Sequence, residues 1–380
     1  TVWDESLEWM QGNTPEEGNF GGAGNADQLE YYDNYERTDD FEYPEGAYGV
    51  MSWWDYGHWI TVRGERIPNA NPFQEGATPA ANFLLAPNET QSQEVLDSQS
   101  DDPNEQTRYV MVDWQMATPG SKFGAPTVFY DAEENVSRQD FLRTMYRFDD
   151  ENEGRFVGTT SVRTDRFYDS TMTKLYYYHG SARSPSPIVF DWEERQVQTN
   201  SGDPVTVSAN PQGETFVKTF ENMSAAEAYV EDDGTAQIGG VGAYPSERVE
   251  ALDHYRLAHV SDTSAANSIL RTTGRNSQIT GLNPQAAVPS NPAWLKTFER
   301  VPGATVEGSG APANANVTAQ VELRIPNTNS TFTYTQRAET DENGNFEMTL
   351  PYSTTDYDEY GPENGYTNVS VRATGPYTVS

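Results

Sequence analysis

The chain has 380 residues, more than one hydrophobic core usually holds, so we expect two or three domains. Its 24 basic and 58 acidic residues give a net charge of −34, which would repel a phosphate backbone and excludes nucleic acid as a partner. The absence of cysteine excludes disulfides, thiolate metal sites and cysteine nucleophiles.

The acidic surplus comes with very few lysines: only Lys122, Lys174, Lys218 and Lys296. A surface rich in carboxylates and poor in lysine is typical of a protein that works in molar salt, where its self-repulsion is screened. A surface built to bind cations or a basic partner is the alternative. The 8 Trp, 22 Tyr and 16 Phe residues argue for a folded core rather than disorder.

No run of the sequence approaches the roughly 18 apolar residues that a membrane helix needs. The first residue is Thr rather than Met, and no signal peptide is recognisable. We therefore expect a segment taken from a longer protein.

The first half of the chain predicts helices and strands in mixed order. A short amphipathic helix with Asp4 as its N-cap opens the chain, and a long surface loop over 16–46 follows. An apolar and aromatic segment spans 47–62. The run from Tyr109 to Trp114, rich in β-branched and aromatic residues, predicts a strand.

Further along, residues 141–146 and 171–178 are expected to be helical, and 247–259 fits either a strand or a helix. Together these patterns predict an α+β core domain, helices with a sheet, over residues 1–271. Residues 272–302 are polar and punctuated by Gly and Pro, and indicate a linker or an extended connection.

The composition after this connection is that of an all-β region. Apolar and polar residues alternate from Val317 to Leu323, as they do in half-buried strands. The Asn-Gly pair within 341–345 predicts a hairpin turn; its Asp/Asn spacing resembles the start of a calcium loop, but no Glu closes the frame. We predict a small β-sandwich accessory domain over 303–380.

Two adjacent indoles followed by a carboxylate, Trp53-Trp54-Asp55-Tyr56-Gly57, form the most distinctive motif of the chain. Flanking indoles would strip water from the carboxylate, which would then favour a ligand that donates a hydroxyl hydrogen bond. This arrangement suits the side chain of Ser or Thr. The simpler interpretation is a core segment in which both rings are packed and Asp55 caps a helix.

This motif resembles the Trp-Trp-Asp-Tyr-Gly signature of the catalytic subunits of oligosaccharyltransferases, in particular the archaeal AglB type from haloarchaea. The resemblance implies a part of an enzyme that transfers a lipid-linked oligosaccharide to the Asn of Asn-x-Ser/Thr. It further implies that Trp53, Trp54 and Asp55, followed by Tyr56 and Gly57, bind the hydroxyl of the Ser or Thr two positions after that Asn.

The family also carries a second motif on a nearby helix, either Asp-x-x-Lys or Met-x-x-Ile. The matching stretch here places Asp169 before the helix as its cap, with Met172, Lys174 and Leu175 within it. Lys174 falls two residues later than the first form requires, and Leu175 replaces the Ile of the second. An ordinary packed helix is the alternative.

The resemblance places the catalytic groups and the metal, Mn²⁺ or Mg²⁺, in a preceding membrane domain, so we expect no catalytic residue and no metal ligand in this chain. The expected partners are an acceptor polypeptide with Asn-x-Ser/Thr, a dolichol-phosphate-linked oligosaccharide reached through the membrane domain, and that domain itself. The chain would then face the outside of the cell membrane. The alternative function is a secreted structural or carbohydrate-binding surface protein.

Overall fold

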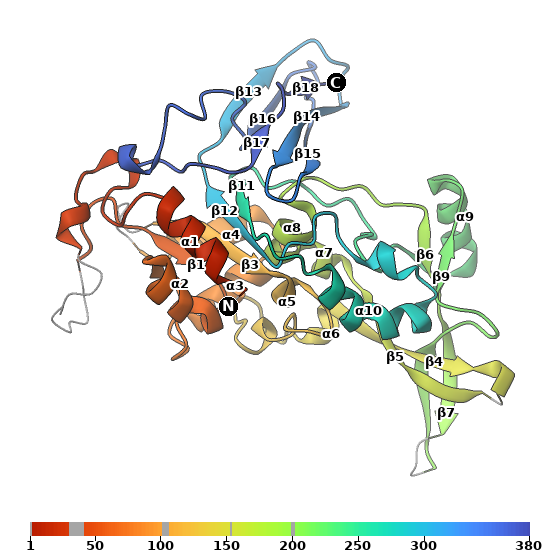
Figure 1. The fold of residues 1–380 in the computed structure, drawn as a ribbon. Coiled ribbons are helices and arrows are strands. Elements are labelled where there is room, and N and C mark those ends of the chain that lie inside the picture. Colours follow the sequence, from red (N-terminus) through yellow and green to blue (C-terminus); the bar gives the residue numbers. More distant parts are fainter. Residues whose placement is uncertain (1, 30–41, 101–105, 153, 199–201) are drawn as a thin grey trace.

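The computed structural model describes residues 2–29, 42–100, 106–152, 154–198 and 202–380. A five-stranded sheet lies at the centre of the molecule (Figure 1). Its order is β11 (Tyr255–Val260), β12 (Leu295–Arg300), β3 (Thr107–Asp113), β1 (Gly49–Met51), β2 (Ile67–Pro68). Strand β1 is parallel to β2 and β3, whereas β12 is antiparallel to β3 and β11. The carboxyl ends of β1 and β3 therefore meet at one edge of the sheet.

Helices pack around this sheet: α1 (Asp4–Asn13), α2 (Gly57–Gly64), α3 (Ala77–Leu85), α4 (Glu89–Asp97), α5 (Trp114–Ala117), α8 (Thr171–Tyr178). Helix α1 was predicted, but Trp3 rather than Asp4 occupies its N-cap position. The predicted strand at 109–114 is β3, except that Trp114 already begins α5. The expected α+β core is confirmed. Within the described ranges, no helix is long and apolar enough to span a membrane.

A second group of strands extends away from the central sheet (Figure 1). One sheet has the order β5 (Arg155–Arg163), β4 (Leu142–Asp149), β8 (Pro204–Ala209), β7 (Glu193–Gln198), and a smaller one β10 (Gln237–Ile238), β6 (Ile188–Phe190), β9 (Val217–Thr219). Three helices accompany them: α6 (Arg138–Phe141), α7 (Asp165–Asp169), α9 (Met223–Asp233).

The helix expected over 141–146 is wrong. Helix α6 ends at Phe141, and the following residues form β4, which pairs with β5 along its whole length. The misread run contains Thr144 and Tyr146, whose β-branched and aromatic side chains suit a strand, and the cross-strand partner decided between the two conformations.

The linker or extended connection predicted over 272–302 does not describe the start and end of this range. Helix α10 (Ala266–Thr280) covers its beginning, and β12 at its end is a central strand of the main sheet. The helix was missed because it is polar, and few of its described side chains, among them Ile269 and Thr273, are buried. The division of the chain into 1–271, 272–302 and 303–380 stays a prediction.

The C-terminal region is rich in β-structure, as expected. One sheet joins β15 (Ser330–Glu339), β14 (Asn316–Ile325), β17 (Arg372–Ala373) and β18 (Thr378–Val379), and the other joins β13 (Ala304–Gly308) to β16 (Phe346–Leu350). Residues of β14 alternate between exposed and buried, which confirms the predicted pattern. The region packs on the core domain, where Tyr334 Oη donates to the carbonyl oxygen of Leu252 at 2.9 Å.

The Asn-Gly segment forms a turn, with the Asp341 carboxylate accepting the backbone N–H groups of Asn343 and Asn345 at 2.8 Å. The hairpin prediction is wrong, because β16 after the turn pairs with β13 and not with β15. The turn residues make the chain change direction, while the packing of the two sheets decides which strand β16 pairs with.

Candidate functional site

The Trp-Trp-Asp-Tyr-Gly motif lies at the carboxyl edge of the central sheet. Strand β1 ends at Met51, and the next residue, Ser52, donates its hydroxyl to the carbonyl oxygen of Met111 in β3 at 2.9 Å. Trp53 is extended, the next three residues form a short 3-10 helix, and α2 starts at Gly57. In sheets with parallel strands this edge is where ligands are usually bound.

Gly57 is required by its surroundings. A Cβ atom at this position would lie 2.0 Å from the carbonyl oxygen of Ala70, and real Cβ atoms do not approach backbone that closely. The loop around Ala70 thus presses directly on the first turn of α2. The last residue of the motif is therefore needed to hold the preceding carboxylate and indoles at the sheet edge.

The two indoles differ in exposure. Trp53 is buried and Trp54 is half-buried, and both pack against Phe129, with ring centroids 5.7 and 6.3 Å from its own. The Trp54 indole N–H is buried, and within the described ranges it has no hydrogen-bond partner. An orphaned buried donor costs free energy, which a ligand or a water molecule that accepts its hydrogen bond would recover.

Asp55 is half-buried and forms an ion pair with Lys122, whose Nζ lies 2.7 Å from its Oδ2. Lys122 also donates to Tyr56 Oη at 3.3 Å, and its ammonium lies over the Tyr56 ring. Tyr56 in turn donates its hydroxyl to Asp113 Oδ2 at 2.8 Å. A hydrogen-bonded chain thus joins a carboxylate at the surface to one that is wholly buried.

Burial is the main cause of the pKa shifts of Asp113 and Tyr56. It raises the pKa of Asp113 to about 6, although hydrogen bonds from the Met116 backbone and Tyr56 and the charge of Lys122 oppose the rise. Burial, helped by the charge of Asp113, also raises the pKa of Tyr56, so the phenol stays a hydrogen-bond donor at neutral pH. Its role is to anchor the motif on β3 rather than to transfer a proton.

The second expected group lies on α8 and the helix before it. Asp169 does not cap α8, because it is the last residue of α7 and Ser170 takes the N-cap position. Lys174 is buried, with Nζ 3.9 Å from Asp169 Oδ1 and donating to the carbonyl oxygen of Pro87 at 3.3 Å. Met172 and Leu175 have no exposed surface.

The two groups are connected through shared supports. Helix α8 packs against α5 and β3, and Asp113 is both the last residue of β3 and the N-cap of α5. The buried face of α8 therefore supports the same sheet edge to which Tyr56 is anchored.

Lys122, Asp113 and Phe129 complete the site and escaped the sequence analysis. One signal was present: the chain keeps four lysines, and each is partnered in the structure. Lys122 and Lys174 contact carboxylates, Lys218 pairs with Asp191 at 3.2 Å, and Lys296 lies buried with Nζ 2.8 Å from His179 Nε2. In a chain that avoids lysine, each retained lysine was a candidate.

Two family models match the chain. The AglB core domain covers residues 1–117, which include the Trp-Trp-Asp-Tyr-Gly motif, and the archaeal glycosylation protein B long peripheral domain covers residues 303–380. The first matched range ends at the last residue of α5, so it holds Asp113 but not Lys122.

Curated relatives extend the similarity to almost the whole chain. The dolichyl-monophosphooligosaccharide–protein glycotransferase AglB of Haloferax volcanii is 61% identical over 99% of this chain and 36% of its own length. The dolichyl-phosphooligosaccharide–protein glycotransferase 3 of Archaeoglobus fulgidus is 25% identical over 92% of this chain and 37% of its own length. The chain thus spans just over a third of the length of these relatives. The Haloferax relative agrees with the composition expected of a halophile.

Solved structures of an Archaeoglobus fulgidus oligosaccharyltransferase share the fold. A complex with Zn and sulfate superposes with a TM-score of 0.61 at 21% identity, covering 100% of this chain and 43% of that one. A complex of AglB with an inhibitory peptide and a dolichol-phosphate gives 0.60 at 22%, covering 100% and 40%. Another structure from this organism is tethered to an acceptor peptide containing the NVT sequon. The same arrangement of helices, mixed sheets and a β-rich C-terminal region therefore occurs in these proteins.

Proposed function

Because this chain belongs to the AglB family of archaeal oligosaccharyltransferases, we propose that it recognises the acceptor in an enzyme that joins a lipid-linked oligosaccharide to the Asn of Asn-x-Ser/Thr. The observation that carries this proposal is the position of Asp55. Its carboxylate stands half-exposed at the sheet edge, next to the orphaned Trp54 indole, and is held by Lys122.

In this proposal the hydroxyl of the Ser or Thr two positions after the acceptor Asn donates to Asp55. Among the described residues, Lys122 bonds Asp55 at Oδ2, which leaves Oδ1 to accept from a second donor. Trp53, Trp54 and Phe129 form an apolar wall that limits water access. An acceptor with Ala at this position offers no donor and leaves the carboxylate partly desolvated without compensation.

We assign the residues around α8 a positioning role. Met172 and Leu175 are wholly buried, and among the described residues Lys174 pairs with Asp169 and donates to the Pro87 carbonyl oxygen. The lysine contacts hold α8 against α7 and the segment after α3, while α8 also packs on α5 and on β3, whose last residue, Asp113, receives the Tyr56 hydroxyl. Acceptor contact is left to the motif itself.

The bond-making step belongs to the part of the enzyme outside this chain. Within the described ranges, no group of three or more His, Asp or Glu side chains is arranged to hold a metal ion. We propose that the Mn²⁺ or Mg²⁺ ion and the dolichol-phosphate-linked oligosaccharide are bound by a membrane domain of the same enzyme. The present chain would then lie at the outer face of the cell membrane.

The complete native enzyme, assayed in its membranes in molar KCl, tests the acceptor role. Peptides with Asn-x-Thr and Asn-x-Ala are compared in wild type, Asp55→Asn and Asp97→Asn. Asp97 is the matched control, since it also pairs with a cation, Arg300, at 2.7 Å. A hydrogen bond to a charged group contributes enough that Asp55→Asn should lower transfer to the Thr peptide roughly 10- to 100-fold.

The Asp97→Asn enzyme should glycosylate the Thr peptide at the wild-type rate. Both it and the wild type should prefer the Asn-x-Thr peptide over the Asn-x-Ala peptide. An Asp55→Asn enzyme that glycosylates the Thr peptide at the wild-type rate contradicts the assignment. So does an Asp55→Asn enzyme that is slower but keeps the full preference for Thr over Ala, because its carboxylate then acts on something other than the hydroxyl.

A further inference from the structure

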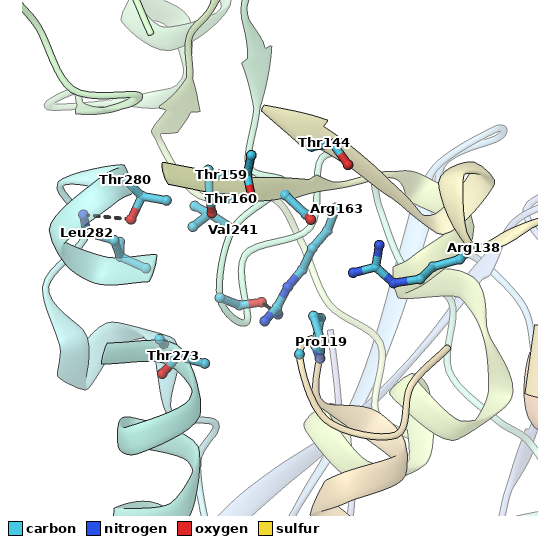
Figure 2. Close-up of a pocket in the computed structure, with 14 residues that line it drawn as sticks. Pro119, Arg138, Thr144, Thr159, Thr160, Arg163, Val241, Thr273, Thr280 and Leu282 are labelled. Carbon is cyan, nitrogen blue, oxygen red and sulfur yellow. Dashed lines mark hydrogen bonds between the residues drawn. The ribbon is translucent and has the colours of Figure 1, made fainter. Parts of the chain in front are cut away.

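A cavity of about 240 Å³ borders the loop that carries Lys122 (Figure 2). Pro119 and Gly120 of this loop form part of its wall, and the rest comes from α6, β4, β5, α10, the segment around Val241, and Leu282 and Ala287. The volume would hold roughly eight water molecules at about 30 Å³ each, which is enough room for one sugar ring. Nothing in the acceptor site uses this space.

Two arginines dominate the chemistry of the cavity. Arg163 on β5 is almost wholly buried; its Nη1 donates to the carbonyl oxygen of Gly242, and its guanidinium lies 4.7 Å from the centroid of the Phe167 ring. Arg138 at the start of α6 is exposed. Figure 2 shows both side chains extending into the same space beside Pro119. Of the carboxylates the structure describes, none forms an ion pair with either arginine.

The charge of this cavity is opposite to that of the chain. The protein carries 58 acidic residues, yet the described lining contains no Asp or Glu. A buried guanidinium without a carboxylate partner is costly. Arg163 bonds the Gly242 carbonyl oxygen and interacts with the hydroxyls of Tyr168 and Tyr177, and these neutral groups do not balance its charge. The planar donor fork of arginine matches carboxylate and other oxyanions. The cavity is therefore suited to an anion.

The remaining polar lining consists of hydroxyl-bearing residues. They are Thr144, Thr159, Thr160, Ser161, Thr273 and Thr280. Hydroxyls both donate and accept, so a wall of them matches a ligand that carries several hydroxyls of its own. An isolated inorganic anion would leave much of the cavity to water.

We propose that this cavity binds an acidic sugar residue, with its carboxylate on Arg138 and Arg163 and its ring hydroxyls on the threonine and serine side chains. The site is distinct from the acceptor site and does not depend on it. The two are neighbours along one loop: Gly120 and Gly124 flank Lys122, and a Cβ atom on Gly124 would approach Arg138 Cδ to 3.1 Å. A sugar in the cavity therefore lies against the segment that delivers Lys122 to Asp55.

Ligand-observed saturation-transfer NMR on the 380-residue chain in molar KCl tests the proposal. The probe is glucuronate, compared with glucose, acetate and inorganic phosphate. The variant is Arg138→Gln. Because the Arg138 side chain is exposed, its replacement should leave the fold intact. The matched control is Arg143→Gln, since Arg143 on neighbouring β4 is outside the lining and bonds Gln237 Oε1 at 2.9 Å. Thermal unfolding checks that both variants are folded.

Glucuronate should receive saturation from wild type and from Arg143→Gln, with roughly tenfold weaker binding to Arg138→Gln. Glucose, acetate and phosphate should bind at least tenfold more weakly than glucuronate. The proposal is overturned if glucuronate gives no signal, or if Arg138→Gln binds it as wild type does. If glucose bound as tightly as glucuronate, the carboxylate would not contribute to binding. If acetate or phosphate bound as tightly as glucuronate, the sugar ring would not contribute.

Discussion

Two of the four lysines of this chain pair with an aspartate near the central sheet, and the two pairs differ in almost every physical respect. Lys122 and Asp55 are 2.7 Å apart, with about a third of each side chain exposed (35% and 29%). Lys174 and Asp169 are 3.9 Å apart, and the lysine is only 5% exposed. Burial lowers the pKa of Lys174 and raises that of Asp169 to about 6.

This difference suits the two ion pairs to two tasks, contact with the acceptor for Asp55 and support of the sheet edge for Lys174. An ion pair in contact with water is weak, so Asp55 can accept a bond from an arriving hydroxyl at little cost. A buried lysine has already lost its hydration and is held by fixed partners. Lys174 is therefore not placed to form a new hydrogen bond with an arriving peptide. The family resemblance implied acceptor binding for the first group and gave the second only a place on a nearby helix; we propose contact for the first and positioning for the second.

The largest effect should come from deforming the backbone of the motif. In Gly57→Ala the new Cβ would overlap the Ala70 carbonyl oxygen, and the free energy of unfolding should fall by about 3 kcal/mol. The control is Gly12→Ala in α1, where a Cβ meets nothing within 4 Å and helix propensity should add about 0.5 to 1 kcal/mol. Denaturant unfolding in molar KCl measures both. Equal stability of the two variants would show that the motif backbone tolerates a side chain.

The second test concerns the buried end of the hydrogen-bonded chain at the motif. Since the folded pKa of Asp113, about 6, lies above its ordinary value of 3.8, the folded state holds the proton more tightly. Its contribution to stability is complete below pH 4 and is lost as the pH rises through 6. The loss is at most about 3 kcal/mol.

Asp113→Asn should therefore flatten the fall in unfolding free energy between pH 4 and 6, while Asp97→Asn keeps it. Glu17, whose pKa burial raises from 4.5 to about 8, should add a fall in every variant that begins near pH 4.5, overlaps this range and continues to pH 8. Unfolding free energies measured across this range at constant salt provide the check. An unchanged slope in Asp113→Asn would mean that this carboxyl titrates normally.

The smallest effect on stability, and the sharpest contrast, should come from replacing each lysine in turn. Lys122→Met removes a partly exposed pair, so stability should change by less than about 1 kcal/mol. Acceptor peptide should nonetheless bind the complete enzyme roughly tenfold more weakly, because Asp55 loses the bond that orients it.

Lys174→Met should leave acceptor binding unchanged and lower the free energy of unfolding by about 1 kcal/mol, since the Pro87 carbonyl oxygen loses a donor and the partly exposed Asp169 loses its counter-charge. The assay is acceptor binding and denaturant unfolding on both variants. Weakened binding in Lys174→Met with intact stability would bring α8 back into acceptor contact and erase the distinction between the two pairs.

Local patterns in the sequence reached part of this description. The alternation in β14, the helix α8 and the strand β3 were predicted because each is encoded by neighbouring residues. Helix α10 and strand β12 were missed for the opposite reason. The first is polar, with few of its described side chains buried, and the second carries Lys296 and Glu299, whose burial depends on the strands at either side.

The sequence by itself determined the acidic, lysine-poor character of the chain, and the five-residue motif with its family. The tertiary structure alone decided what surrounds the motif. Lys122 is 67 positions from Asp55, and Asp113 is 57 from Tyr56, and no local period relates them. They meet because β1 and β3 run parallel and end at one edge. Contacts between distant residues are set by how strands pair, and strand pairing is a property of the whole fold.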